Sequence, residues 1–184
     1  MADYILFAGV NGAGKTTLYQ TDDYYKDTPR INMDEIVRGI GSWKNQEDVH
    51  RAGMIAVRML KDYFDKGITF NQETTLCGRS VIGNINKAHT LGYRVILYYV
   101  GLDSVDIAKE RVRLRVQNGG HGIPEADIEK RYVESLLNLK KIISVCEQVV
   151  LFDNTYSFYK VAVFENGRCV DKADHMPVWC NGWL

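Results

Sequence analysis

The stretch "YILFAGVNGAGKTTLYQ" (residues 4–20) joins an apolar run to a glycine-rich segment and then to a helical pattern. Residues 9–16 fit GxxxxGK[ST], the P-loop pattern, in the strand-to-helix context that this motif requires. Glycines allow consecutive backbone N–H groups to turn toward phosphate oxygens, and the N-terminus of the following helix adds a partial positive charge. The stretch therefore predicts a phosphate-binding loop and a helix that begins near Lys15.

The loop predicts ATP and Mg²⁺ as the cofactors. The Lys15 amine would reach the β- and γ-phosphate oxygens, and the Thr16 hydroxyl would ligate Mg²⁺. An ordinary glycine-rich turn is the alternative interpretation. No GTP-specificity motif such as NKxD follows the later strands, so the sequence disfavours a GTPase. We predict that the nucleotide is bound by the loop residues Asn11, Gly12, Ala13, Gly14, Lys15, Thr16 and Thr17.

Length and charge restrict the remaining classes of protein. The chain has 184 residues, which fits one domain over residues 1–184 with a substantial core. Its 23 lysines and arginines equal its 23 aspartates and glutamates, so the overall charge favours neither nucleic acid nor a membrane surface as a partner. No run of about 18 apolar residues occurs, and the four cysteines show no CxxC spacing. We expect a cytoplasmic protein with reduced thiols and with no nucleic-acid or membrane partner.

Short apolar runs alternate with helical patterns along the chain. This alternation predicts an α/β fold of the P-loop NTPase type, a three-layer α/β/α sandwich around a mostly parallel five-stranded sheet. The predicted strands cover residues 4–9, 31–34, 68–73, 93–102 and 149–153. Later helices are predicted at about 47–66, 80–91 and 125–147, and another follows a cap at Asp103 or Ser104. A C-terminal β-hairpin at about 156–173, with Asn166-Gly167 in its turn, would be an appendage to this core.

Two carboxylates follow predicted strands near the loop. Asp34 ends the second strand, where a small-molecule kinase keeps the base that accepts the proton of the attacking hydroxyl. The alternative role for Asp34 is to cap the helix "EIVRGI" (35–40). Glu73 ends the third strand and would bind the acceptor or a Mg²⁺-bound water, the alternative being a solvated loop acid. We predict Glu73, Thr75 and Arg79 as the acceptor-binding residues.

The segment "NGGHGIPEAD" (118–127) interrupts two helices and predicts a mobile connector, because clustered glycines do not continue a helix cheaply. Arg111, Arg115 and Arg131 flank it, so closure of a lid over about 111–131 would bring guanidinium groups to the transferring phosphoryl group. A solvated basic helix face is the alternative. His121 would end the lid or touch phosphate. The predicted catalytic residues are Lys15, Asp34, Arg115 and Arg131.

These motifs together are similar to those of a known family. The order of "GVNGAGKTT" (9–17), "NMDEI" (32–36), "NQETTL" (71–76) and "RVRLRVQNGGHGIPEADIEKRY" (111–132) resembles the zeta-toxin-like P-loop kinases, including compact bacterial members labelled predicted ABC-type ATPases. The resemblance covers most of residues 4–154 and leaves the hairpin outside.

The resemblance implies roles for individual residues. Asp34 matches the catalytic base, Lys15 the essential loop lysine, and the lid arginines the groups that contact the γ-phosphate. Glu73 and Thr75 match the acceptor pocket, where the best-known members bind a UDP-N-acetylhexosamine and phosphorylate its 3′-hydroxyl. The stretch "QTDDYYKDT" (20–28) has no match in the family, so toxicity, an antitoxin partner and a UDP-sugar acceptor do not carry over as phosphoryl transfer does.

The sequence therefore predicts an ATP- and Mg²⁺-dependent kinase for a hydroxyl of a small molecule such as a nucleotide sugar or nucleoside. Two other functions stay open at this point. One is an ATP-binding regulatory or interaction module with incidental ATPase activity. The other is a kinase for nucleic-acid ends, which would favour a basic groove interleaved with aromatic residues.

Overall fold

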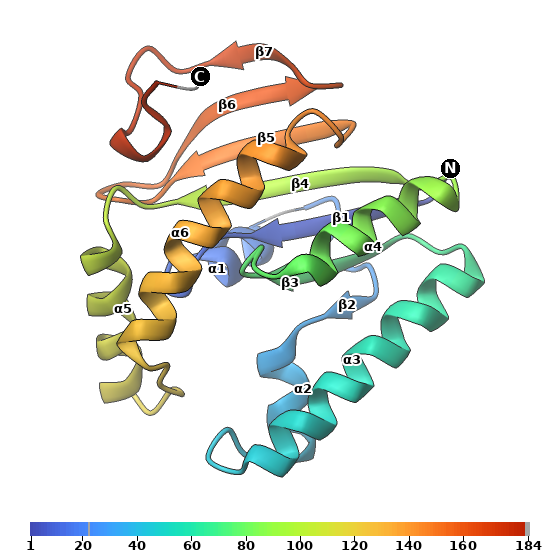
Figure 1. Ribbon diagram of the computed structural model, residues 1–184, viewed down its shortest axis with the longest axis vertical. Helices are drawn as coiled ribbons and strands as arrows, with labels where there is room; N and C mark the ends of the chain where they lie inside the picture. The colour runs from blue at the N-terminus through green and yellow to red at the C-terminus, as the bar shows by residue number, and fades with distance from the viewer. Residues whose placement is uncertain (22, 183–184) are drawn as a thin grey trace.

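A single seven-stranded sheet organises the part of the chain that the computed structural model describes, residues 1–21 and 23–182 (Figure 1). The strand order is β2-β3-β1-β4-β5-β6-β7. The first five strands along this order are parallel and the last two are antiparallel. The strands are β1 Asp3–Ala8, β2 Arg30–Ile31, β3 Phe70–Thr74, β4 Arg94–Gly101, β5 Gln148–Asp153, β6 Tyr159–Glu165 and β7 Arg168–Lys172.

Helices cover both faces of the sheet, which confirms the predicted three-layer sandwich. Alternate residues of β1 face opposite layers, as the two-residue period of a strand requires. Tyr4 and Leu6 pack in the core shared by α3, α4 and α6, whereas Ile5 and Phe7 pack in the core shared by α1 and α5. The helices are α1 Lys15–Thr21, α2 Met33–Ile40, α3 Gln46–Lys66, α4 Arg79–Thr90, α5 Val105–Gln117, α6 Glu125–Ile142 and the 3₁₀ helix Val178–Cys180.

The C-terminal hairpin continues the sheet instead of forming an appendage. Its predicted turn is confirmed, because Asn166 and Gly167 both adopt positive φ angles, 49° and 75°. Strand β6 pairs with β5, so that Val149 lies opposite Phe164 and the five parallel strands become part of a seven-stranded sheet. The five predicted strands are therefore all present, but the sheet has two more, β6 and β7, which the hairpin adds to its edge.

The chain after the hairpin returns to the sheet through Trp179. This indole lies against Gly101 at the end of β4, where a β-carbon would come within 2.2 Å of the ring. Its Nε1 atom donates to Oδ1 of the buried Asp153 at 2.9 Å, and Thr155 donates to the same oxygen at 2.7 Å. The C-terminal segment thus packs into the main core.

The second strand is shorter than predicted, and this changes the position of Asp34. Strand β2 ends at Ile31, and Asn32 caps the helix α2 by accepting hydrogen bonds from the N–H groups of Asp34, at 2.8 Å, and Glu35, at 3.3 Å. Asp34 therefore lies in the first turn of a helix and is neither a strand end nor the cap.

Other boundaries agree closely with the sequence patterns. Helix α3 ends before Gly67 as expected, and Ser104, one of the two predicted caps, accepts the N–H of Ile107. Helix α6 ends at Ile142, earlier than predicted. Asp22, in the stretch 20–28 that has no match in the family, lies outside the described residues. None of the helices in residues 1–21 and 23–182 is long and apolar enough to cross a membrane.

The strand order fixes where a ligand can bind. Strand β1 lies between β3 and β4: the chain first adds β2 and β3 on one side of it and then crosses to add β4 and β5 on the other. In open α/β sheets, ligands bind at the carboxyl ends of the strands at such a switch point. Here that point is the loop after β1, which faces the α5–α6 lid and the α2–α3 pair (Figure 1).

Candidate active site

The loop between β1 and α1 has the compact shape of a phosphate cradle. The N–H of Ala13 donates to the carbonyl oxygen of Val10 at 3.1 Å, which turns the chain back on itself. Gly14 has a φ of +104°, and a β-carbon there would lie 2.5 Å from Nδ2 of Asn154. That same Nδ2 donates to the carbonyl oxygen of Ala13 at 2.8 Å. Glycine is therefore required at this position both by its backbone angle and by its neighbour.

Lys15 carries its amine to the centre of this loop. Only 7% of the residue is exposed, and Nζ donates to the carbonyl oxygen of Val10 at 3.2 Å. Burial lowers the pKa of Lys15, whereas the nearby carboxylates of Glu73, with Oε1 at 3.9 Å, and Asp34 act to raise it. Because the nearby carboxylates only partly offset the cost of burying this ammonium, its binding to phosphate oxygens is favoured.

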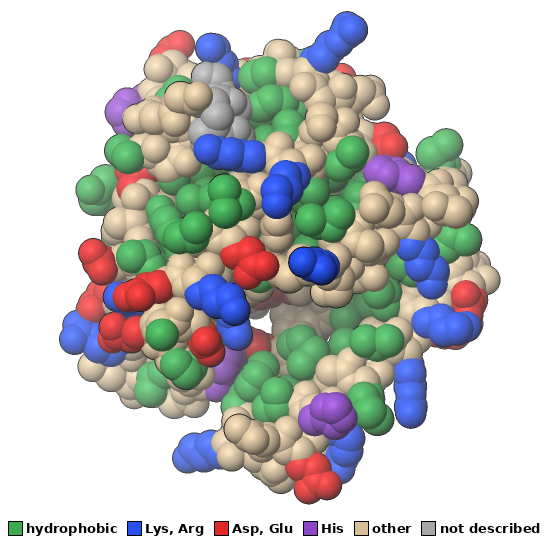
Figure 2. All heavy atoms as spheres, in the orientation of Figure 1, with side chains coloured by type: hydrophobic (Ala, Val, Ile, Leu, Met, Phe, Trp, Pro, Cys, Tyr) green, Lys and Arg blue, Asp and Glu red, His purple; other side chains and the backbone are tan. Residues whose placement is uncertain are grey.

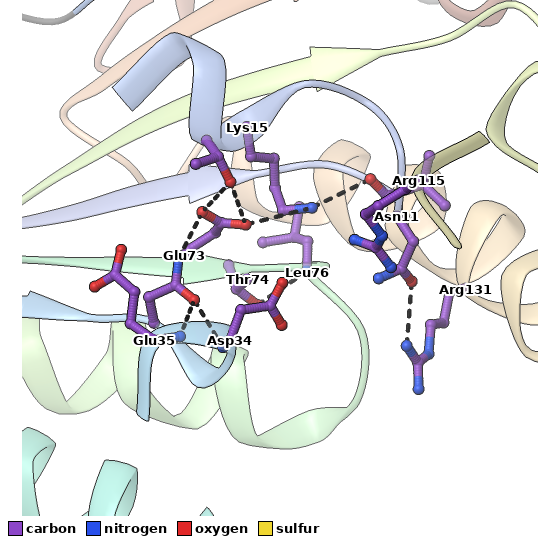
Figure 3. A network of polar contacts seen from close by, with 12 residues as sticks. Asn11, Lys15, Asp34, Glu35, Glu73, Thr74, Leu76, Arg115 and Arg131 are labelled. Atoms are coloured by element: carbon purple, nitrogen blue, oxygen red, sulfur yellow. Dashed lines mark hydrogen bonds and ion pairs between the residues drawn. The ribbon is translucent and has the colours of Figure 1, made fainter. Parts of the chain in front are cut away.

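Glu73 joins the loop to the neighbouring strand. It lies opposite Phe7 in the β1–β3 pair, and its carboxylate accepts a hydrogen bond from the Thr16 hydroxyl at 3.1 Å. Figure 3 shows this carboxylate facing Lys15. Its Oε2 atom also accepts from Nη2 of Arg30 at 2.7 Å and from Nδ2 of Asn32 at 3.0 Å. The structure thus places Glu73 beside the predicted magnesium ligand, a position also suited to holding a Mg²⁺-bound water.

Two residues of this network were not found from the sequence. Arg30 is held on all sides, because it also donates to Glu35 at 3.1 Å and to Asn71 at 3.0 Å, while its guanidinium lies 3.5 Å from the ring centre of Tyr19. Asn32 links the same carboxylate to the start of α2. A single arginine and a single asparagine carry no pattern that would have indicated these contacts.

The lid arginines divide into two groups. Arg131 donates from Nη1 to Oδ1 of Asn11 in the phosphate loop at 3.1 Å, and Nη2 of Arg115 lies 3.4 Å from Nε2 of His121. The Nε atom of Arg115 is buried and, among the described residues, has no hydrogen-bond partner. Arg111 instead donates to the carbonyl oxygen of Asn154 at 2.6 Å. Arg115 and Arg131 line the cavity, and Arg111 holds the loop after β5.

His121, in the connector, contacts the opposite wall of the site. Its ring stacks on Trp43 with the centres 4.1 Å apart and the planes 11° apart. Its Nδ1 atom lies 3.8 Å from Oδ2 of Asp34. Burial lowers the pKa of His121, while the Asp34 carboxylate acts to raise it. Trp43 was not identified from the sequence, because a single tryptophan in the turn between α2 and α3 has no motif around it.

These residues enclose a cavity of about 840 Å³ between the phosphate loop, the lid and the α2–α3 pair. Figure 2 shows that the surface is hollowed between the lid and the α2–α3 pair, which lies at the bottom of this view. Of the predicted site residues, those that line the cavity are Asn11, Lys15, Asp34, Glu73, Thr75, Arg115 and Arg131. Arg79 is exposed at the first position of α4 and lies outside this lining. The remaining loop residues are not part of this lining, namely Gly12, Ala13, Gly14, Thr16 and Thr17.

Comparison with known proteins gives a shorter relative that is matched over most of its length. An uncharacterized protein of Haemophilus influenzae (strain ATCC 51907 / DSM 11121 / KW20 / Rd) is 32% identical over 130 residues, which are 70% of this chain and 91% of that protein. No family model matches the chain.

Solved structures share the fold at low sequence identity. A chain of the AvrRxo1-ORF1:-ORF2 complex with ATP is 14% identical with a TM-score of 0.71, and the match covers 91% of this chain and 59% of that one. A chain from the PezAT toxin-antitoxin system of Streptococcus pneumoniae is 17% identical with a TM-score of 0.63, over 87% of this chain and 72% of that one. This chain thus spans about three fifths of the AvrRxo1 chain that it matches.

Proposed function

We propose that this chain, which belongs to the same family as the Haemophilus influenzae protein and has the fold of the zeta-toxin-like P-loop kinases, transfers the γ-phosphoryl group of ATP to a hydroxyl of a small molecule. One observation carries the proposal. A single cavity is lined by the loop lysine, a helix-borne aspartate and two lid arginines, namely Lys15, Asp34, Arg115 and Arg131. These are the groups that positioning and charge stabilisation of phosphoryl transfer require.

The loop side of the cavity fits a triphosphate and Mg²⁺. The buried Lys15 amine would bind the β- and γ-phosphate oxygens, and the Thr16 hydroxyl with the Glu73 carboxylate supplies the oxygen ligands that magnesium prefers. When bound, Mg²⁺ would neutralise charge that develops on the phosphate oxygens. Arg30 and Asn32 hold the Glu73 carboxylate in this position, so little reorganisation is needed.

Asp34 would accept the proton of the attacking hydroxyl. Its carboxylate lines the same cavity as Lys15, and its place in the first turn of α2 is fixed by the Asn32 cap. A general base must lie within hydrogen-bond reach of the proton that it removes, and an acceptor in this cavity would meet that condition.

Arg115 and Arg131 would stabilise the transferring group and exclude water. Arg131 already contacts the loop through Asn11, and the buried Nε of Arg115, which has no partner within residues 1–21 and 23–182, is a donor that a phosphate oxygen could use. Exclusion of water matters because water competes with the acceptor hydroxyl for the phosphoryl group.

The experiment is transfer of radiolabel from [γ-³²P]ATP in the presence of a small-molecule cell extract, with the products separated from ATP and phosphate. We expect a labelled product that requires both the extract and Asp34. Release of inorganic phosphate at the same rate with and without extract would instead support an ATP-binding module with incidental hydrolysis. Labelling of 5′-hydroxyl oligonucleotides would support a nucleic-acid-end kinase.

A protein partner is a separate part of the proposal. The two solved neighbours come from an AvrRxo1-ORF1:-ORF2 complex and from a toxin-antitoxin system. An antitoxin-like partner is therefore proposed for this chain too, and co-purification from its native cells tests it.

A further inference from the structure

The positive charges around the cavity are all on one side. Among the described residues that line it, the lysines and arginines are Lys15 of the phosphate loop, Arg115 of α5 and Arg131 of α6. The opposite wall, from the described residues 32–78, contributes only uncharged and acidic side chains to the lining. Its carboxylates are Asp34 and Glu73, and its uncharged side chains include Met33, Trp43, Gln46, Val49 and Gln72.

The cations that are nearest to this wall in the sequence are not available to an acceptor in the cavity. The guanidinium of Arg30 is 7% exposed and is used by Glu73, Glu35 and Asn71. Lys44 follows Trp43, and Arg79 begins α4, but both are exposed and outside the lining. Glu73 is thus compensated by Arg30, and an acceptor on this wall would meet the Asp34 carboxylate with no cation of the wall left to bind a phosphate.

Binding of ATP makes this asymmetry stronger. The triphosphate would use the charges of Lys15, Arg115 and Arg131, as the proposed function requires. What remains for the acceptor is Asp34, together with the negative charge of the nucleotide itself. A phosphate on the acceptor would then lie among like charges, and such juxtaposition disfavours binding strongly.

The same wall suits an uncharged ring. Trp43, Val49 and Met33 give it apolar surface, and the amides of Gln46 and Gln72 give it hydrogen-bonding groups. The stack of His121 on Trp43 at 4.1 Å shows that a flat group fits against this indole. A few placed polar groups on an apolar wall are typical of sites for small neutral ligands.

We propose that the acceptor is an uncharged, hydroxyl-bearing ring compound without a phosphate, either a nucleoside or a free sugar, and that Trp43 and Gln46 select it. In the transfer, the acceptor oxygen forms a bond to the γ-phosphorus, the bond from that phosphorus to the β,γ-bridging oxygen breaks, and the hydroxyl proton goes to Asp34. The products are ADP and a monophosphorylated acceptor. This inference rests on the proposed kinase function.

The experiment separates a small-molecule extract of cells on an anion exchanger at neutral pH. Each fraction is then incubated with the full chain, Mg²⁺ and [γ-³²P]ATP, and Asp34→Asn serves as the background. We expect Asp34-dependent labelling from the unbound fraction to exceed that from the bound, anionic fraction by at least about tenfold. Pretreatment with a nucleosidase distinguishes the two sources: loss of labelling identifies a nucleoside, and its retention identifies a free sugar.

A charge variant tests the wall itself. Gln46→Lys adds a cation at the first position of α3, and Asn86→Lys adds the same charge on an exposed face of α4, outside the cavity lining. We expect only Gln46→Lys to raise labelling of anionic compounds relative to neutral ones, by on the order of tenfold.

Each result has a distinct meaning. Labelling predominantly from the anionic fraction of the wild-type reaction would overturn the inference and leave the kinase function intact. Absence of any labelled product beyond that from ATP alone, in every fraction, would overturn the kinase function and the inference with it. An unchanged preference in Gln46→Lys would remove Gln46 from the proposed selection.

Discussion

The Nδ1 atom of His121 lies 3.8 Å from Oδ2 of Asp34, so the lid connector reaches the carboxylate that we assign as the base. The same imidazole stacks on Trp43, and its Nε2 atom faces Arg115. One side chain therefore links the lid to α2 and to the α2–α3 connection.

Burial of His121 predicts a pH dependence of stability. Burial lowers the pKa of His121 in the folded protein, whereas a histidine in the unfolded chain has a pKa of about 6.5. The unfolded chain therefore binds a proton more readily, and folded stability falls as the pH drops below that value. His121→Gln should reduce this slope between pH 7 and pH 5, as measured by urea midpoints. The exposed His175→Gln is the matched control, and equal slopes in both variants would contradict the prediction.

Removal of the Asp34 carboxylate should separate chemistry from nucleotide binding. Asp34→Asn keeps the side-chain shape but loses the base, so transfer should fall by about 10²–10⁴-fold. ATP affinity, measured by calorimetry, should stay within a few fold, because the phosphate loop is untouched. Glu35→Gln alters the adjacent carboxylate and should retain most of the activity. Wild-type transfer in Asp34→Asn would show that another group acts as base.

Lys15 should affect binding and rate together. The lysine amine is the buried cation of the loop, and a charge-assisted hydrogen bond to phosphate contributes about 1.5–3 kcal/mol, which corresponds to roughly 10–100-fold in affinity. Lys15→Ala should therefore weaken ATP binding by this factor and lower turnover further. Normal ATP binding and turnover in this variant would exclude the loop as the nucleotide site.

Glu73 should set the requirement for the divalent cation. Glu73→Gln keeps an oxygen near Thr16 but removes the charge, so half-maximal activity should need at least about tenfold more Mg²⁺. Asp127→Asn removes a different carboxylate from the lining of the same cavity and should leave the Mg²⁺ requirement unchanged. An equal shift in both variants would mean that the cavity's total charge, and not the Thr16–Glu73 pair, controls the cation.

The parts of the fold that were predicted correctly are those with local signals. The P-loop residues and the long helix α3 follow from spacing alone, and Asn166-Gly167 marks a tight turn wherever it occurs between strands. The start of α2 was misplaced because "NMDEI" suits a strand as well as a capped helix. In the fold, Asn32 caps α2 and also donates to Glu73, a residue 41 positions later that local sequence could not indicate as its partner.

In the candidate site, too, residues with a local sequence signal could be predicted and residues defined by distant contacts could not. Lys15, Asp34 and the lid arginines belong to motifs, so their placement around one cavity could be anticipated. The stack of Trp43 on His121 joins segments far apart in the chain, and neither residue carries a pattern that names the other. The role of Arg111 also depended on the fold, because its partner Asn154 lies after a later strand.

The C-terminal segment should be needed for stability. Trp179→Ala would leave a space beside Gly101 and would remove the indole donor to the buried Asp153. Loss of a buried tryptophan costs about 3–5 kcal/mol, which would appear as a lower urea midpoint. Val178→Ala alters the exposed neighbour and should change the midpoint little. Similar midpoints for both variants would show that the segment is dispensable.

The hairpin should also protect the protein from aggregation through the edges of its sheet. Without β6, the apolar strand β5 would present an unpaired edge along Val149 and Leu151, which other chains could extend. The sheet instead ends at β2, which has only two residues, and at β7, where all five residues are exposed and three are charged. Both margins are poor templates for strand addition, so the protein should stay monodisperse at concentrations where a truncated core would form aggregates.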